Sequence, residues 1–283
     1  MKPIRGVIYA CLAASMIVPA RAVAQVTAAP PATAAPPATQ GTYEPKVGQA
    51  GKDVVWVPSP ESTVEKMLDV AKVTPQDFVV DLGSGDGRNV IAAAKRGARG
   101  LGVEYNQDMV ELSKRNAQKA GVADKAQFVQ GDMYAAEFSQ ATVLALFLLP
   151  ENLNKLRAKF ADLKPGTRIV ANTFGIEGWT PEEQMTIEGD CTSWCTVLLY
   201  YVPAKVDGAW QSGKGELSLK QEFQTVSGTL GGAAIESVKI KGDQLSFTAG
   251  GAEYSGRVNG NTITGVVKTG ATQTPWTATR SVR

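Results

Sequence analysis

Residues 78–88 read FVVDLGSGDGR and decide the fold of this chain. A short apolar run ends at Asp81 and is followed by Gly83, Gly85 and Gly87, after which an alanine-rich segment with helical spacing begins. Glycine adopts the positive φ angles of a tight turn and lets a ligand approach the backbone. The N-terminus of the helix that follows offers free amides to an anionic group. The stretch therefore predicts a strand, a ligand-binding turn and a helix.

Strands and helices continue to alternate along the next hundred residues. An uninterrupted apolar run at 143–149 is typical of a strand buried on both faces of a parallel sheet. Alternating strands and helices predict an α/β fold, a doubly wound Rossmann-like sheet. A final pair of strands is expected at 185–188 and 196–202. The other strands are predicted at 100–104, 126–129 and 167–174.

Acidic residues follow two of these strands where they could bind a nucleoside. Glu104 ends the second strand and can accept both hydroxyls of a ribose, and Asp132 follows the third strand and can accept an adenine amino group. Glu104 alone is equally compatible with a dinucleotide. The dinucleotide pattern G-x-G-x-x-G, however, needs a third glycine where this chain has Arg88.

Three motifs, VDLGSGDG at 80–87, GVEYN at 102–106 and GDM at 131–133, together resemble the S-adenosylmethionine site of class I methyltransferases. The resemblance covers roughly residues 54–202. The resemblance implies S-adenosylmethionine as cofactor. The turn from Gly83 through Gly85 to Gly87 would lie against its methionyl part, and Asp81 would help to hold its ammonium. Glu104 would bind the ribose, while Asp132 and the backbone amide of Met133 would contact the adenine.

Three further stretches, VPSP at 57–60, LFLLPE at 146–151 and NTF at 172–174, resemble bacterial and mitochondrial protein-lysine methyltransferases. This resemblance implies transfer of a methyl group to a lysine of a protein substrate. Enzymes that methylate DNA bases or glutamine amides carry N-P-P-Y or D-P-P-Y where this chain has LLPE at 148–151. That departure argues against a base amino group or an amide as acceptor.

Glu151 and Asn172 are the catalytic candidates. A carboxylate beside the sulfonium could orient a lysine ammonium and assist the loss of its proton. Glu151 could equally be a first-turn carboxylate that the helix dipole favours. Trp56 and Tyr43 are further pocket candidates, and each of them, like Asn172, could instead belong to the core or the surface.

Composition excludes several kinds of site. The 283 residues contain no His and 3 Cys, so a histidine base, a His-ligated metal and a four-cysteine zinc site are excluded, and we predict no metal. The formal net charge is +2, and it becomes −1 without the three basic residues of the first 24. A near-neutral chain has no electrostatic footprint for nucleic acid or an anionic membrane.

The N-terminal residues have the organisation of a secretory signal. Basic residues precede an apolar stretch at 7–18, and Ala-Val-Ala at 22–24 is a small-residue cleavage site. We expect 1–24 to be a signal peptide and the mature protein to be periplasmic or secreted, without a membrane span; an uncleaved anchor is the alternative. The repeat TAAPPA within 25–42 predicts an extended spacer.

Cys11 would leave with the signal, whereas Cys191 and Cys195 would remain. In an exported protein, two cysteines so close in sequence predict a disulfide that closes a loop.

After a methyltransferase domain at 43–204, composition shifts to Gly, Thr, Ser and Val. Turn signals at 242–243, 250–251 and 259–261 separate short strand patterns, which predicts a small antiparallel β-meander or barrel at 205–283. The seven predicted strands are 216–223, 225–230, 234–240, 244–248, 253–258, 262–267 and 275–279. It resembles lipocalin-like modules of bacterial exported proteins, and a binding role and a purely structural role both stay open. A second hypothesis for the whole chain is a catalytically silent S-adenosylmethionine-binding or scaffold protein of the cell envelope.

Overall fold

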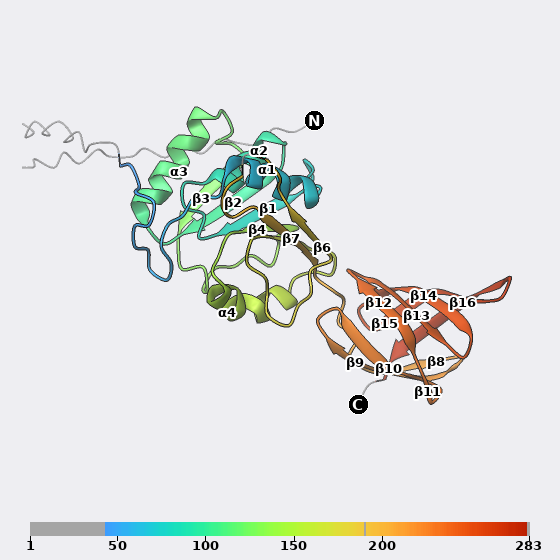
Figure 1. The fold of residues 1–283 in the computed structure, drawn as a ribbon. Helices are drawn as coiled ribbons and strands as arrows, with labels where there is room; N and C mark the ends of the chain where they lie inside the picture. The colour runs from blue at the N-terminus through green and yellow to red at the C-terminus, as the bar shows by residue number, and fades with distance from the viewer. Residues whose placement is uncertain (1–42, 190, 282–283) are drawn as a thin grey trace, which may run out of the picture. The chain divides into compact units, whose positions relative to one another are not determined.

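The computed structural model describes residues 43–189 and 191–281, which form two separate sheets with their own cores (Figure 1). The predicted signal peptide at 1–24 and spacer at 25–42 lie outside the described residues. The boundary predicted between residues 204 and 205 stays a prediction, although Ala204 already packs in the core of the second sheet.

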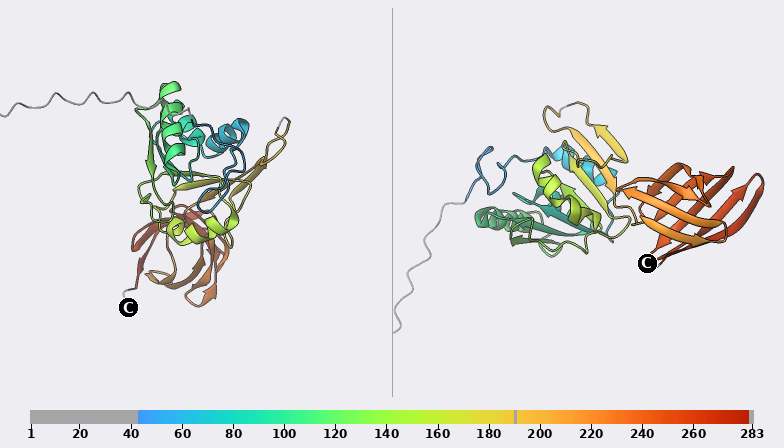
Figure 2. Two further views of the ribbon diagram at one scale, coloured as in Figure 1. Left: turned by 90° about the vertical axis from the view of Figure 1, so that its left-hand side faces the viewer. Right: turned by 90° about the horizontal axis from the view of Figure 1, so that it is seen from below.

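The first sheet has seven strands in the order β3-β2-β1-β4-β5-β7-β6. The first five along the chain are parallel, β7 is antiparallel to β5, and β6 pairs with β7 as a hairpin at the sheet edge (Figure 2). The order reverses between β1 and β4, and ligands of open α/β sheets bind at such a point. The strands are β1 (Phe78–Leu82), β2 (Arg99–Glu104), β3 (Ala126–Gln130), β4 (Val143–Leu146), β5 (Arg168–Asn172), β6 (Glu183–Thr186) and β7 (Thr196–Tyr201).

Helices cover both faces of this sheet, as a doubly wound fold requires. Successive residues of β1 point to opposite faces, so Val79 packs with α1 and α2 while Val80 packs with α4. The helices are α1 (Glu61–Val70), α2 (Arg88–Lys95), α3 (Gln107–Lys119) and α4 (Pro150–Ala161). Among the helices of the described residues, none has the length and apolar composition to cross a membrane. The predicted fold class is confirmed.

The second sheet is antiparallel and barrel-like, with nine strands in the order β11-β10-β9-β8-β16-β15-β14-β13-β12. Its core is built from alternate residues, among them Trp210, Leu217, Ile263 and Trp276. The sequence predicted seven of these strands and missed β8 and β11, because β8 has one buried aromatic among small and polar residues and β11 has two residues. The strands are β8 (Gly208–Ser212), β9 (Gly215–Glu222), β10 (Thr225–Leu230), β11 (Ala233–Ala234), β12 (Glu236–Lys241), β13 (Gln244–Ala249), β14 (Ala252–Asn259), β15 (Thr262–Thr269) and β16 (Thr272–Arg280).

The loop between β6 and β7 contains the predicted disulfide. Cys191 and Cys195 are bonded, with their Cα atoms 5.8 Å apart. This bond closes the end of the hairpin and fixes the backbone near Trp194.

Candidate functional site

The turn between β1 and α2 can be built only with glycine. Gly83, Gly85 and Gly87 have φ angles of +75°, +54° and +84°. A Cβ on Gly85 would lie 2.7 Å from Nε1 of Trp56, and one on Gly87 would lie 2.7 Å from the Phe128 ring. The turn therefore needs glycine both for its conformation and for its close packing.

Two side chains of α3 donate hydrogen bonds to carbonyl groups of this turn. Ser113 Oγ donates to the carbonyl of Gly85 at 2.7 Å, and Asn116 Nδ2 donates to the carbonyl of Asp86 at 3.0 Å. With these carbonyls bonded, the turn has a fixed shape before any ligand binds.

Glu104, at the end of β2, joins the turn to the start of α3. Its Oε2 accepts the backbone N–H of Gly85 at 3.0 Å, and its Oε1 accepts that of Asn106 at 2.9 Å. Asn106 in turn caps α3, because its Oδ1 accepts the N–H of Asp108 at 2.9 Å. The carboxylate is thus held in place beside the turn.

Asp81, the last but one residue of β1, is 3% exposed. Burial raises its pKa well above the usual range, the charges of Glu104 and Asp86 add to this, and a hydrogen bond from Asn89 Nδ2 at 3.1 Å acts in the opposite direction. Asn89 Oδ1 is buried and accepts no hydrogen bond from the residues that the structure describes. A cationic ligand at this position would favour the ionised carboxylate, and its N–H groups would satisfy Asn89.

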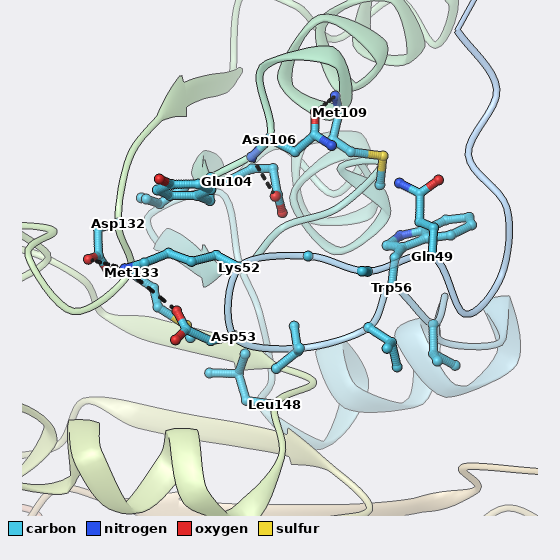
Figure 3. Close-up of a pocket in the computed structure, with 18 of the residues that line it drawn as sticks. Gln49, Lys52, Asp53, Trp56, Glu104, Asn106, Met109, Asp132, Met133 and Leu148 are labelled. Carbon is cyan, nitrogen blue, oxygen red and sulfur yellow. Dashed lines mark hydrogen bonds and ion pairs between the residues drawn. The ribbon is translucent and has the colours of Figure 1, made fainter.

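A cavity with about 740 Å³ of empty space, its open mouth included, lies beside Glu104 (Figure 3). The sequence candidates that line it are Trp56, Gly83, Glu104, Asp132 and Met133. The structure therefore brings together residues from the ends of β1, β2 and β3, as the motifs predicted.

Residues 49–57 form one wall of this cavity, and we call residues 48–57 the strap. Of the strap, the sequence predicted only Trp56 as a pocket residue. The strap folds back on itself, because Gly48 N donates to the carbonyl of Trp56 and Gly51 N donates to that of Val54. Trp56 packs against Gly85. Tyr43, predicted as a pocket residue, accepts a hydrogen bond from Gln49 Nε2 and so supports the strap.

Lys52, on the strap, reaches Asp132 across the cavity (Figure 3). Its Nζ lies 2.7 Å from Asp132 Oδ2 and 5.2 Å from the centre of the Tyr105 ring. The hydrogen bond from Lys52, together with one from the Tyr134 N–H, lowers the pKa of Asp132. The carboxylate predicted to contact adenine is thus already paired with a cation.

A smaller cavity adjoins the first one at the glycine turn. Asp81, Gly85 and Asn89 line this second cavity, whereas Gly87 lines neither cavity. The residues that line both cavities are Trp56, Val57, Gly83 and Phe147. The two cavities together follow the turn from the buried carboxylate of Asp81 to the space beside Glu104, and we call them the cofactor groove.

Neither catalytic candidate lines either cavity. Glu151 is exposed in the first turn of α4. Asn172 is buried, donates to Ser59 Oγ at 3.0 Å and accepts from Thr173 Oγ1 at 2.9 Å. The structure thus places Asn172 in the framework behind the cavities, and a catalytic role for either residue stays a prediction.

The same part of the chain matches known proteins. The model of the ANTKMT methyltransferase domain matches residues 81–183. A protein-lysine N-methyltransferase of Saccharolobus islandicus (strain REY15A) is 41% identical over 152 residues, which are 53% of this chain and 94% of that protein. This chain belongs to that methyltransferase family.

Two further relatives of this methyltransferase extend the comparison. The adenine nucleotide translocase lysine N-methyltransferase of Mus musculus is 33% identical over 45% of this chain and 56% of its own length. This chain thus spans about half of that relative. A crystal structure of an RNA methyltransferase from Salinibacter ruber in complex with S-adenosyl-L-homocysteine is 43% identical, with a TM-score of 0.50, over 53% of this chain and 96% of that one.

The cofactor of this methyltransferase is S-adenosylmethionine, and the cavities fit it. Gly83 and Gly85 of the turn line the cavities, and the buried carboxylate of Asp81 lies beside Asn89, whose Oδ1 has no hydrogen-bond partner among the described residues. A sulfonium and an ammonium are the charges that such an acidic end would stabilise. The resemblance seen in the sequence motifs is confirmed at the level of family, fold and cofactor.

Proposed function

We propose that this methyltransferase transfers the methyl group of S-adenosylmethionine to the side-chain amine of lysine in a protein substrate. The observation that carries this proposal is the 41% identity to a protein-lysine N-methyltransferase across 94% of that protein's length. Lysine N-methyltransferases named for the adenine nucleotide translocase and for ATP synthase are further relatives, and they support the same acceptor.

RNA is the competing acceptor, because one similar crystal structure is of an RNA methyltransferase. Two features of this chain favour lysine over RNA. The chain beyond the predicted signal has a formal net charge of −1, whereas RNA-binding proteins carry an excess of basic residues. It also has LLPE at 148–151 where enzymes acting on base amino groups carry N-P-P-Y.

We also propose a role for each cofactor-binding residue. Asp81 and Asn89, which line one end of the cofactor groove, bind the ammonium, and the turn from Gly83 to Gly87, of which Gly83 and Gly85 line the groove, lies against the methionyl part. Glu104 holds the ribose hydroxyls with the lone pairs that its two backbone hydrogen bonds leave free. Asp132 and Met133 contact the adenine.

Bound S-adenosylmethionine supplies a methyl group activated on a sulfonium. The residues of this chain hold the two reactants in line, which is the main requirement of a displacement at carbon. The acceptor lysine must lose a proton before it attacks. Glu151, which is exposed in the first turn of α4, is the proposed proton acceptor. A Glu151→Gln variant with a shifted pH profile for transfer would support that role.

We further propose that the protein works in the periplasm or outside the cell. The signal-like residues 1–24 support export, and the Cys191–Cys195 bond is of a kind that persists in oxidising compartments. Fractionation of expressing cells, with mass spectrometry of the N-terminus, tests this. A mature N-terminus at Gln25 in the periplasmic fraction supports export, and an intact Met1 in the cytoplasm contradicts it.

The acceptor is tested with S-adenosylmethionine that carries a deuterated methyl group. Purified protein is incubated with an envelope protein extract and with total RNA in separate reactions, and the products are digested and analysed by mass spectrometry. Deuterated methyl-lysine supports the proposal. Label in nucleosides contradicts it, and bound cofactor without any transfer favours the catalytically silent alternative.

A further inference from the structure

Three aromatic side chains meet where β4 and β5 end. Phe147 follows β4, Phe174 follows β5, and Trp194 comes from the disulfide-closed loop between β6 and β7. The ring centres of Phe147 and Phe174 are 6.2 Å apart, and Trp194 lies 5.6 Å from each of them. We call Phe147, Phe174 and Trp194 the aromatic cluster.

The aromatic cluster adjoins the cofactor groove and remains accessible. Phe147 lines both cavities, including the end beside Asp81. Phe147 and Phe174 are half-buried, and Trp194 is 38% exposed. Three aromatic residues that served only to fill the core would be buried, as Phe160 and Trp210 are in this chain.

The backbone that presents Phe174 adopts a costly conformation. Thr173 has a φ of +62°, and Phe174 N donates to the carbonyl of Asn172 at 2.7 Å, which closes a three-residue turn. A positive φ is rare for a β-branched residue, and a three-residue turn with positive φ at its centre is strained. The buried Asn172 side chain accepts from Thr173 Oγ1 and thereby holds the turn.

Trp194 also has a backbone conformation that is rare for residues other than glycine. Its φ is +59°, and its carbonyl accepts a hydrogen bond from Thr63 Oγ1 of α1 at 3.2 Å. The disulfide between Cys191 and Cys195 spans it. Strained backbone in two segments that meet at one surface points to a functional requirement for the positions of the side chains.

Aromatic faces attract cations, and ammonium groups that carry methyl groups are ligands of such aromatic surfaces. We propose that the aromatic cluster binds the methylated ammonium end of the acceptor side chain, and that Trp194 is a specificity-determining residue of this acceptor site. This inference rests on lysine as the proposed acceptor. The disulfide and Thr63 then act as positioning groups for Trp194.

The proposal is tested by binding, without any methyl transfer. The probe is Nα-acetyl-Nε-trimethyl-lysine amide, and its control is the neutral analogue in which carbon replaces the charged nitrogen. Protein with 15N-labelled tryptophan gives one indole signal for each of its 5 Trp, and loss of a signal in Trp194→Phe assigns Trp194. We expect the cationic probe to shift the Trp194 signal and to bind about tenfold more tightly than the neutral analogue.

Variants separate a cation site from simple apolar packing. Trp194→Leu keeps an apolar side chain and should abolish the preference for the cation, whereas Trp194→Phe should retain part of it. The double variant Cys191→Ser, Cys195→Ser should weaken binding of the cationic probe severalfold. Leu149→Ala is an exposed apolar control outside the aromatic cluster. It should change neither the preference for the cationic probe nor the affinity for that probe.

Affinity for S-adenosylmethionine, measured by calorimetry, should remain the same in all of these variants. An unchanged affinity shows that the variant is folded. Equal binding of both probes, or a cation preference that survives Trp194→Leu, overturns the proposal. If the cation preference is present but deuterated methyl groups never reach lysine, the proposed function fails while the site itself stands.

Discussion

Glu104 Oε2 accepts the backbone N–H of Gly85 at 3.0 Å, so the carboxylate that ends β2 also fixes the glycine turn that follows β1. Its other oxygen accepts the N–H of Asn106. Each carboxylate oxygen can accept about two hydrogen bonds, which leaves capacity for the two hydroxyls of a ribose. One side chain thus shapes the turn and binds the ligand.

Replacing Glu104 should therefore affect both properties. In Glu104→Gln one amide oxygen remains as acceptor, and the amide nitrogen faces a backbone donor. We expect affinity for S-adenosylmethionine to fall by about 2 kcal/mol and the free energy of unfolding to fall by about 1 kcal/mol. Calorimetric titration and urea denaturation measure the two. Glu111→Gln, on the exposed side of α3, should change neither value.

Asp81→Asn should stabilise the ligand-free protein and abolish tight cofactor binding. Because burial raises the pKa of Asp81, the folded state retains the proton at pH values where the unfolded state has lost it. The wild-type protein therefore loses stability as pH rises from the unfolded pKa of about 3.9 through the raised folded pKa. Asparagine does not titrate, so the free energy of unfolding of Asp81→Asn should exceed that of wild type by an amount that grows as pH rises over this window.

Urea denaturation of both proteins at several pH values checks this. A stability difference that does not change with pH would show that Asp81 titrates normally. For the wild-type protein, cofactor affinity should rise with pH over the same window, because the cationic cofactor selects the ionised carboxylate.

Gly85→Ala and Gly121→Ala form a matched pair. Both glycines have positive φ, but a Cβ at position 121 meets nothing within 4 Å, whereas one at position 85 meets Trp56. The left-handed conformation alone costs about 1–2 kcal/mol for alanine. We expect Gly121→Ala to show only this cost in thermal or urea denaturation. Gly85→Ala should lose more stability and also weaken cofactor binding, and equal effects would mean that Trp56 yields freely.

Removing Lys52 should strengthen cofactor binding at low ionic strength. Lys52 Nζ occupies Asp132 Oδ2, the oxygen that an adenine amino group would use. Lys52→Met frees that oxygen, and the gain over wild type should shrink as salt screens the exposed ion pair. Calorimetry at several salt concentrations measures this. Weaker binding in Lys52→Met would instead indicate that Lys52 itself holds the cofactor.

The sequence was sufficient where local pattern determines structure. Gly83, Gly85 and Gly87 mark a turn that only glycine can form, and Glu104 and Asp132 follow apolar strands whose carboxyl ends meet at one edge. The antiparallel sheet was predictable for the same reason, since its hairpins have glycine and asparagine turns.

Long-range contacts could not be predicted in this way. Lys52 and Asp132 are 80 residues apart, and nothing in the pattern of residues 48–57 indicates a strap over the cofactor groove. Phe147, Phe174 and Trp194 come from three separate loops and meet only in the folded chain. Glu151 follows β4 as predicted, but α4 begins at Pro150 and leaves it exposed.

Calorimetric titration with S-adenosylmethionine and S-adenosylhomocysteine, of wild type and Glu104→Gln side by side, tests the central claim most directly. We predict micromolar binding of both ligands to the wild-type protein and at least about tenfold weaker binding to Glu104→Gln. A folded wild-type protein that binds neither ligand, or a Glu104→Gln variant that binds both as well as wild type does, would contradict this account of the site.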